Sequence, residues 1–251
     1  MYRIVKEYEL IRSKESVEKT KYVKNMFGEI SARYDLLNWI MTLGKHRKWR
    51  EKAAVIACIG NNRQALRVLD VASGTGDFAF QISKHENVNH ITAMDLSEEM
   101  LMIAKRKSEN VKSSCDTDFL VCDVMHMPFP DDLFSVVTVG FGFRNFVDLE
   151  RGLSEMIRVA EPGGKVVILE IVKPEGILMS KIFPVYFRRL TPLLGSLFAG
   201  NVEAYKYLPE SVNNFVSSSQ IKTMMEIVGL KNVSVERLAM GSVGIISGTK
   251  F

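Results

Sequence analysis

The fold is decided by ten residues, VLDVASGTGD, which run from Val68 to Asp77. An apolar run typical of a buried strand leads directly into a loop with two glycines, which is how a nucleotide-binding βαβ unit begins. Two carboxylates, Asp70 and Asp77, flank this loop, and both would repel a diphosphate. The stretch therefore predicts an α/β sheet with a ligand at the end of its first strand, and that ligand must tolerate negative charge.

Short apolar runs alternate with amphipathic helical patterns along the rest of the chain. We predict strands at 66–71, 90–96, 117–123, 133–140, 165–172, 231–238 and 241–250, with helices at 77–84, 97–108, 149–160 and 218–228. Such alternation predicts a doubly wound, mostly parallel seven-stranded sheet with helices on both faces. The sequence EPGG at 161–164 predicts a tight turn before the fifth strand.

A chain of 251 residues is most simply one domain with additions. We expect a flexible arm with little function at 1–21, either a frayed helix or a disordered segment, because its charged sequence is only weakly periodic. The domain at 22–251 is then divided into a helical cap (22–65), a ligand-binding core (66–173), a helical insertion (174–217) and a C-terminal helix with two strands (218–251). Within the cap, Gly44 is expected to end one helix before the next begins.

Composition excludes several classes of protein. Three scattered cysteines (Cys58, Cys115 and Cys122) and four histidines suggest neither a disulfide framework nor a zinc site, so we expect no metal. The first residues lack the apolar segment of a signal peptide, and no apolar run reaches the roughly 18 residues of a membrane-spanning helix. A net charge of +4 is weak for a nucleic-acid binder. We expect a cytoplasmic protein without a nucleic-acid partner.

Three acids each end a predicted strand: Asp70, Asp95 and Asp123. The carboxyl ends of parallel strands meet at one edge of a sheet, so these side chains should gather there. A diphosphate is disfavoured at such an edge, whereas S-adenosylmethionine has no phosphate and presents an ammonium, a sulfonium, ribose hydroxyls and an adenine amine to the acids. Each acid alone could equally be a helix cap, but together they favour a ligand site.

Six further stretches narrow the function. They are Tyr34-Asp35-x-x-Asn38, Gly44-x-His46-Arg47-x-Trp49, Pro128-Phe129-Pro130-Asp131, Phe141-Gly142-x-Arg144-Asn145, Glu161-Pro162-Gly163-Gly164 and Tyr205-x-Tyr207-Leu208-x-x-Ser211. In this order and spacing the chain, from about Tyr22 to its end, resembles the ubiquinone/menaquinone biosynthesis C-methyltransferase family. The resemblance implies a Rossmann-like class I methyltransferase fold, S-adenosylmethionine as cofactor, and methylation of a ring carbon of a polyprenyl quinol, either demethylmenaquinol or the equivalent ubiquinone precursor.

The resemblance also implies a set of cofactor-binding residues. They are Asp70, Gly74, Thr75, Gly76, Asp95, Asp123, Val124 and Gly140. Two of these places depart from the family's common pattern, which often has an Asn-Ala pair at 123–124 and a serine at 140. Asp123 can still accept a hydrogen bond from the adenine amine, but Gly140 could contact the cofactor only through its backbone.

A sulfonium is already an activated methyl donor, so the protein must supply orientation and an electron-rich carbon. Loss of a quinol proton makes the ring a phenolate. Arg144 is too basic to take that proton, but it could hold a water and stabilise the phenolate. Asn145 could position the hydroxyl, while Asp148 and Tyr34 are candidates for the base or its relay. Two histidines are weaker candidates, because one precedes a turn and one lies in a basic segment: His126 and His46.

Two segments have two readings each. The apolar segment at 176–201, with Tyr205 and Tyr207 after it, is either a lid over the polyprenyl tail or an insertion packed on the sheet. The basic stretch KHRKWR at 45–50 either meets anionic headgroups at the inner face of the membrane or is a solvated helix face. A homodimer is one possible assembly.

Three other functions remain open from the residues alone. An RNA methyltransferase would suit the mild positive charge and Trp49 among basic residues. An NAD-dependent oxidoreductase would rest on Gly74, Gly76 and Ala79, read as G-x-G-x-x-A, with Asp95 as the ribose acid. A non-catalytic binding module would keep the fold and use the apolar segment for a partner.

Overall fold

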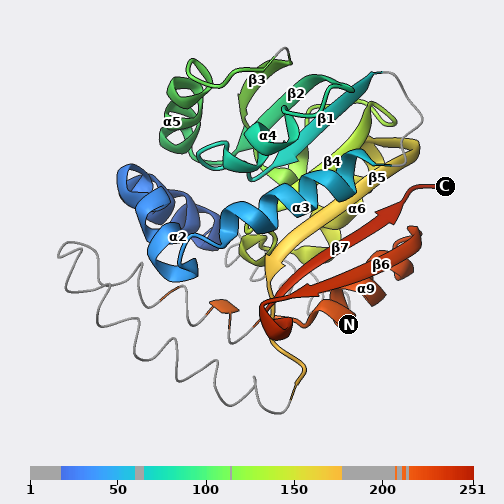
Figure 1. Cartoon of the computed structure of the whole chain (residues 1–251). Helices are drawn as coiled ribbons and strands as arrows, with labels where there is room; N and C mark the ends of the chain where they lie inside the picture. The colour runs from blue at the N-terminus through green and yellow to red at the C-terminus, as the bar shows by residue number, and fades with distance from the viewer. Residues whose placement is uncertain (1–17, 60–64, 114, 177–206, 208–210, 213–214) are drawn as a thin grey trace, which may run out of the picture.

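One seven-stranded sheet organises the molecule (Figure 1). The computed structural model describes residues 18–59, 65–113, 115–176, 207, 211–212 and 215–251. The strands are β1 (Leu66–Val71), β2 (Val88–Asp95), β3 (Asp116–Val121), β4 (Phe134–Gly140), β5 (Ala160–Ile171), β6 (Lys231–Leu238) and β7 (Val243–Thr249), in the order β3-β2-β1-β4-β5-β7-β6. β1 to β5 pair in parallel, and β7 is antiparallel to both neighbours. The predicted sheet is confirmed.

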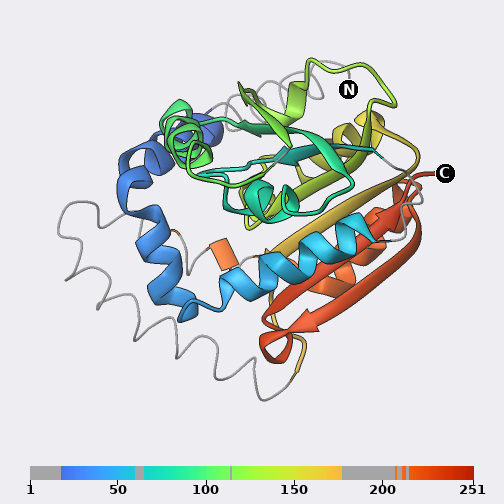
Figure 2. The same cartoon turned by 45° about the horizontal axis from the view of Figure 1, so that its top comes forward.

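Helices cover both faces of the sheet. They are α2 (Tyr34–Thr42), α3 (His46–Cys58), α4 (Asp77–Ile82), α5 (Glu98–Ser108), α6 (Leu149–Val159) and α9 (Ser218–Ile227). Successive side chains of β1 enter opposite cores: Val68 packs on the side of α3 and α4, and Leu69 packs on the side of α6 and α9. Figure 2 shows α3 running along the sheet beside the long β5.

The cap helices are joined by a tight corner. After α2 ends at Thr42, Leu43 and Gly44 both adopt the left-handed conformation, with φ of 51° and 73°. The glycine takes this conformation without steric cost, and α3 begins two residues later. The predicted stop at Gly44 is therefore confirmed.

Of the arm expected at 1–21, only the last four residues are described, and they belong to a helix. Residues 18–30 are helical, and Lys19 Nζ donates a hydrogen bond of 3.2 Å to the carbonyl oxygen of Phe146. This helix is stabilised by contacts with the core that its charged sequence does not reveal. The rest of the arm, 1–17, lies outside the described residues.

The EPGG stretch is not a free turn. β5 begins at Ala160, and the pairing with β4 skips from Ala160 to Lys165 while β4 advances by only two residues, which is a bulge. Gly163 has a φ of 78°, and its amide donates to the carbonyl oxygen of Lys250. Backbone pairing with the end of the chain therefore takes up residues that read locally as a turn.

Within the predicted helical insertion at 174–217, the apolar segment at 176–201, apart from Gly176, lies outside the described residues, as does Tyr205. In the ranges given above, no helix has both the length and the apolar character needed to cross a membrane. The proposed subdivision of the chain stays a prediction.

A buried acid joins the two central strands to the glycine loop. Asp70 has no exposed surface. One of its carboxylate oxygens accepts from Thr138 Oγ1 on β4 at 2.7 Å, and the other accepts from Ser73 Oγ at 2.8 Å. Burial raises the pKa of Asp70 to about 6, although both hydroxyls and the charge of Arg50 oppose the rise. The residue therefore fixes the start of the loop, and it is easier to protonate than an ordinary aspartate.

The raised pKa makes a prediction for stability. Because the folded protein binds this proton more tightly than the unfolded chain, the associated stabilisation is complete below about pH 4 and is lost as the pH rises through 6. In Asp70→Asn this dependence should vanish, so the variant should gain up to about 3 kcal/mol relative to the parent between pH 4 and pH 7. Urea unfolding at several pH values measures the difference. The exposed-site variant Asp116→Asn is the control, and parallel curves for Asp70→Asn and the parent would contradict the assignment.

Candidate functional site

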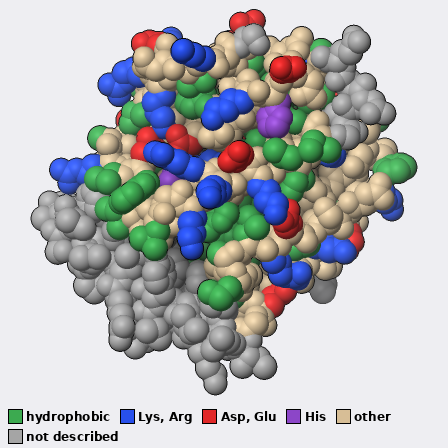
Figure 3. Space-filling view, viewed as in Figure 1, with side chains coloured by type: hydrophobic (Ala, Val, Ile, Leu, Met, Phe, Trp, Pro, Cys, Tyr) green, Lys and Arg blue, Asp and Glu red, His purple; other side chains and the backbone are tan. Residues whose placement is uncertain are grey.

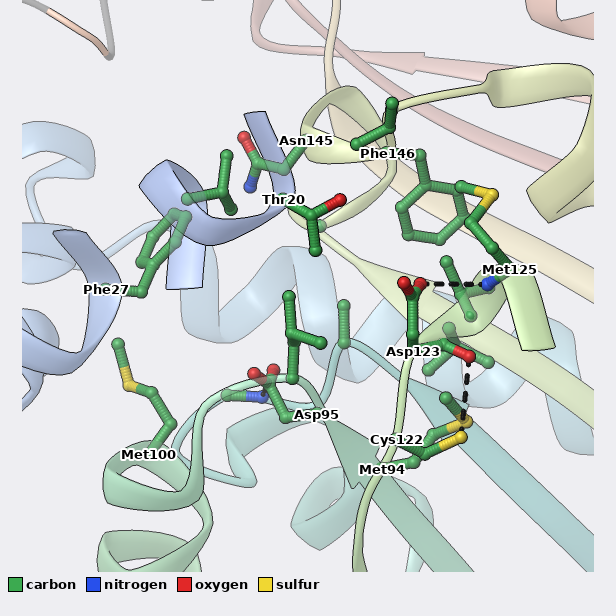
Figure 4. A pocket seen from close by; sticks show the side chains of 18 of the residues that line it. Thr20, Phe27, Met94, Asp95, Met100, Cys122, Asp123, Met125, Asn145 and Phe146 are labelled. Atoms are coloured by element: carbon green, nitrogen blue, oxygen red, sulfur yellow. Dashed lines mark hydrogen bonds between the residues drawn. The ribbon is translucent and has the colours of Figure 1, made fainter. Parts of the chain in front are cut away.

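A pocket opens where the first four strands end. Its lining includes Val71 at the end of β1, Asp95 at the end of β2, Cys122 after β3 and Phe141 after β4. It encloses about 750 Å³ of space, which includes open solvent at its mouth. In Figure 4, Thr20 and Phe27 of the helix at 18–30 lie across the pocket from Asp95. The sheet edge and the N-terminal helix thus enclose one cavity.

The charged side chains in the described pocket wall all have the same sign, which is negative. The described lining contains two carboxylates, Asp95 and Asp123, and no lysine, arginine or histidine. Most of the remaining wall is apolar, including Met94, Met100 and Phe146 (Figure 4). A diphosphate would meet negative charge without a compensating cation. A ligand that offers cations, hydroxyls and an amine to these acids fits the wall, as S-adenosylmethionine does.

Asp95 connects the second strand to the glycine loop. One carboxylate oxygen accepts from the amide of Gly74 at 2.8 Å, and the other accepts from the amide of Ser97 at 2.8 Å. Burial nevertheless raises the pKa of Asp95, against the effect of these backbone hydrogen bonds. Each carboxylate oxygen has a second lone pair that can accept from a ligand hydroxyl.

The two loop glycines do different things. Gly74 lines the pocket with a φ of 57°. A side chain at Gly76 would come within 2.7 Å of the Phe80 ring, so this glycine allows the loop to pack closely against α4. Ala72 and Phe141, which also line the pocket, have φ of 50° and 62°. Such values are rare for residues with a side chain and concentrate at functional sites.

Two of the residues that follow the third strand lie in the pocket wall, but Gly140 does not. Asp123 and Val124 line the pocket, and an Asp123 oxygen accepts from the amide of Met125 at 2.9 Å. Gly140 is outside the described lining, and a Cβ there would be 2.7 Å from the Phe78 ring. Its lack of a side chain therefore serves packing against α4.

Thr75 and Asp77 belong to a charged network behind the pocket. Thr75 Oγ1 donates to Asp35 at 2.6 Å, and Lys107 Nζ donates to Asp35 at 2.9 Å, to Thr75 at 3.2 Å and to Asp77 at 2.5 Å. Arg50 pairs with Asp77 at 3.2 Å. Although burial opposes it, Arg50 and Lys107 hold the pKa of Asp77 below its usual value. The protein's own side chains therefore supply positive charge beside Asp77.

Arg144 is buried against a partner in the sheet. Its Nη1 donates to Glu170 Oε1 and to the carbonyl oxygen of Phe141, both at 2.6 Å, and its amide donates to Glu170 Oε2 at 3.0 Å. Glu170 has no exposed surface. The side chain of Arg144 therefore stands behind the lining, and its position is fixed by three hydrogen bonds.

Asn145 and two tyrosines lie in or next to the pocket wall. Asn145 and Tyr34 line the pocket, and Asn145 Oδ1 accepts from the hydroxyl of Tyr207 at 3.0 Å. Burial raises the pKa of Tyr34 and of Tyr207, although Arg144 opposes both shifts. Both phenols therefore keep their protons near neutral pH and act as hydrogen-bond donors.

Two of the other candidates lie elsewhere. Asp148 caps α6, because its Oδ1 accepts from the amide of Arg151 at 3.0 Å, and it is absent from the described lining. His126 is exposed, with its Nε2 at 2.8 Å from an Arg151 nitrogen. The other weak candidate, His46, is 4% exposed.

The pocket thus gathers half of the predicted site. It brings together Tyr34, Gly74, Asp95, Asp123, Val124 and Asn145, whereas Asp70, Thr75, Gly76, Gly140, Arg144 and Asp148 are outside its described lining. Sequence analysis missed the wall formed by the helix at 18–30, where Thr20, Val23 and Phe27 line the pocket. Their spacing of three and four residues is that of one helix face. This spacing could have predicted the helical wall from the sequence.

Three comparisons with known proteins agree. The chain is 40% identical over 225 residues to a demethylmenaquinone methyltransferase of Thermus thermophilus. This alignment covers 90% of this chain and 100% of the relative. It is 39% identical over 234 residues to a ubiquinone/menaquinone biosynthesis C-methyltransferase of Geobacter sulfurreducens, covering 93% and 90%. Among solved structures, a SAM-dependent methyltransferase of Thermotoga maritima superimposes with a TM-score of 0.60 at 16% identity, covering 91% and 99%, and this likeness shows the fold.

The family comparison covers nearly the whole chain, since the ubiE/COQ5 methyltransferase family matches residues 14–250. The match contains every strand of the sheet and all of the pocket lining described above. The family match and the pocket, whose carboxylates would repel a phosphate group, both indicate the same cofactor, S-adenosylmethionine. The chain belongs to the ubiE/COQ5 methyltransferase family.

Proposed function

We propose that this enzyme transfers a methyl group from S-adenosylmethionine to a ring carbon of a reduced polyprenyl quinone precursor, either demethylmenaquinol or the equivalent ubiquinone precursor. The main support is the similarity over nine tenths of the chain to relatives named for quinone methylation. The same similarity disfavours the RNA methyltransferase, the NAD-dependent oxidoreductase and the non-catalytic binding module.

The pocket supports one orientation of the cofactor. Asp123 and Val124 would meet the adenine, and Asp95 would accept from the ribose hydroxyls. Gly74 would let the backbone approach the methionine part. Asp70, Thr75 and Gly76 would act indirectly, because their contacts hold the loop.

The acceptor chemistry would be supported by residues on the β4 side. The cofactor supplies an electrophilic methyl group. Asn145, oriented by Tyr207, would position the quinol hydroxyl. Arg144 would hold a water that passes the hydroxyl proton on to bulk solvent, and its charge would stabilise the developing phenolate, while Glu170 keeps the guanidinium in place. Tyr34 would donate a hydrogen bond from the opposite wall. Asp148 caps α6, so we assign it no chemical role.

The exposed face of the cap supports contact with a membrane. Leu36, Trp39 and Leu43 are 52%, 51% and 72% exposed; the first two share one face of α2, at a step of three residues, and Leu43 follows at the end of this helix. The exposed Lys45, Arg47 and Lys48 follow directly. Lys and Arg side chains lie across the middle of the view in Figure 3, the region that α3 crosses in Figure 1. An apolar strip beside cations suits an anionic lipid surface. We therefore place the enzyme at the inner face of the membrane; a homodimer stays a prediction.

The cofactor assignment predicts a binding difference. Calorimetric titration should show that the enzyme binds S-adenosylhomocysteine and not NAD. Asp95→Asn should weaken S-adenosylhomocysteine binding by about tenfold to a hundredfold, because it removes a charged acceptor of hydrogen bonds. The exposed-site variant Glu86→Gln should bind like the parent. Binding of NAD without binding of S-adenosylhomocysteine would refute the proposed function.

The acceptor assignment predicts a selective loss of turnover. Asn145→Ala should lower kcat with demethylmenaquinol by about a hundredfold, because the hydroxyl loses its positioning group. Tyr207→Phe should have a smaller effect, since it removes only the hydrogen bond that orients Asn145. A labelled-methyl assay measures transfer, with bulk RNA as the alternative acceptor. The affinity for S-adenosylhomocysteine should stay within about twofold in both variants. Full activity of Asn145→Ala, or methylation of RNA alone, would contradict the assignment.

The membrane proposal predicts weaker vesicle binding when the apolar strip is cut. The double variant with Trp39→Ala and Leu43→Ala should cosediment less with vesicles that contain anionic phospholipid, by about tenfold in the partition coefficient, because both side chains lose apolar burial in the interface. Its turnover of a short-chain soluble acceptor should match that of the parent. Ile227→Ala, at a 77% exposed position on α9, is the matched control. Equal losses in the two variants would contradict the proposed surface.

A further inference from the structure

Four buried nitrogen atoms within the described part of the chain have no hydrogen-bond partner. They are Asn38 Nδ2, His46 Nε2, Arg50 Nε and Arg144 Nε. A buried donor left without a partner costs about 1–3 kcal/mol, and native proteins contain few of them. Several such donors in one region therefore need an explanation, and an acceptor supplied by a ligand is one.

Three of the four side chains lie next to residues that line the pocket. Asn38 lies one turn after Tyr34 in α2. The Arg50 guanidinium carbon is 5.3 Å from the centre of the Phe141 ring. Arg144 donates to the carbonyl oxygen of Phe141. Since Tyr34 and Phe141 both line the pocket, the donors stand directly behind its wall.

The proton on His46 can be placed from its neighbour. Arg50 Nη1 lies within hydrogen-bond distance of His46 Nδ1. An arginine can only donate, so Nδ1 accepts and the proton of the ring is on Nε2. Burial, followed by the charge of Arg50, lowers the pKa of His46 to about 4, so the ring is neutral at physiological pH. His46 Nε2 is therefore a donor without an acceptor.

Arg50 is anchored in a way that leaves Nε available. Its Nη1 pairs with Asp77, and Asp77 also binds Lys107, which holds Thr75 in the glycine loop. His46 and Arg50 follow one another by one turn in α3 and are 4% and 5% exposed. The pair is thus fixed to the cofactor loop and desolvated, which strengthens a hydrogen bond to an anion.

The order of the strands sets the direction in which the cofactor runs. Asp123 follows β3, Asp95 ends β2, Gly74 follows β1 and Phe141 follows β4, and these strands are adjacent in that order. With the adenine at Asp123 and the ribose at Asp95, the methionine part extends past Gly74 towards Phe141. The carboxylate of that part is the only anionic group of S-adenosylmethionine, and this direction brings it towards Phe141, over whose ring the Arg50 guanidinium lies.

We infer that His46 Nε2 and Arg50 Nε, with Asn38 beside them, bind the methionine carboxylate of the cofactor, an inference that rests on the proposed function. Arg144 Nε is left for the acceptor, because Arg144 precedes Asn145 on the side where Tyr207 binds. The two sets of donors then have different partners. Asn38, His46 and Arg50 bind the carboxylate oxygens of the cofactor, and Arg144 binds the oxygen of the quinol.

The test compares two cofactors that differ only in this carboxylate. Calorimetry without acceptor gives the dissociation constants of S-adenosylmethionine and decarboxylated S-adenosylmethionine. The parent should bind the carboxylate-bearing form about tenfold or more tightly. Arg50→Lys keeps a cation beside Asp77 but removes Nε, and His46→Phe keeps a ring but removes Nε2. Each should weaken S-adenosylmethionine by about tenfold and leave the decarboxylated form within about twofold.

Controls separate the possible failures. Glu51→Gln, at an exposed position of the same helix, should bind both ligands like the parent, and thermal unfolding checks that each variant is folded. Equal losses for both ligands, or no loss, would overturn the inference. An unchanged affinity for S-adenosylmethionine with a raised KM for the quinol would assign these donors to the acceptor and overturn it too. A parent that binds both cofactors equally refutes this inference alone, whereas one that binds neither refutes the proposed function.

Discussion

The hydrogen bonds of the buried Asp70 carboxylate are the constraint on which the site depends. They join β1 to β4 through Thr138 and fix the first loop residue through Ser73. Once the loop starts at that point, the amide of Gly74 meets Asp95 at the end of β2. Three adjacent strand ends are thereby held in register around one cavity. Precise placement of this kind matters for methyl transfer, because the donor and the acceptor carbon must be aligned before they react.

Negative and positive side chains lie in different layers of the site. The charged groups of the described pocket wall are carboxylates, whereas the cations Arg50, Lys107 and Arg144 lie behind the wall, each paired with an acid. This arrangement suits a cofactor with a net positive charge and a quinol that becomes negative during the reaction. The pairing also accounts for the cations' burial, since an unpaired charge in that layer would be costly.

The cap contributes more than cover. Its α2 and α3 supply Asp35 and Arg50 to the network that holds the glycine loop, and the helix at 18–30 completes the wall. The proposed membrane strip lies on the exposed face and at the end of α2, and the proposed carboxylate donors are buried side chains of α2 (Asn38) and α3 (His46 and Arg50). Contact with lipid and binding of the cofactor would therefore involve the same small unit of the fold, which makes the cap the natural link between the membrane and the reaction.

The sequence by itself determined the sheet, the glycine loop and the acids at the strand ends, because strand periodicity and turn chemistry are local and parallel strands end at a common edge. Tertiary structure decided which of these residues face the ligand. The Phe78 ring occupies the space beside Gly140, a helix terminus takes Asp148, and Lys107 reaches Asp35 across 72 residues of sequence. His46 read as one more residue of a basic helix, and only packing made it a buried donor. The partner that each side chain contacts depends on residues distant in the sequence, and local sequence patterns carry no information about those residues.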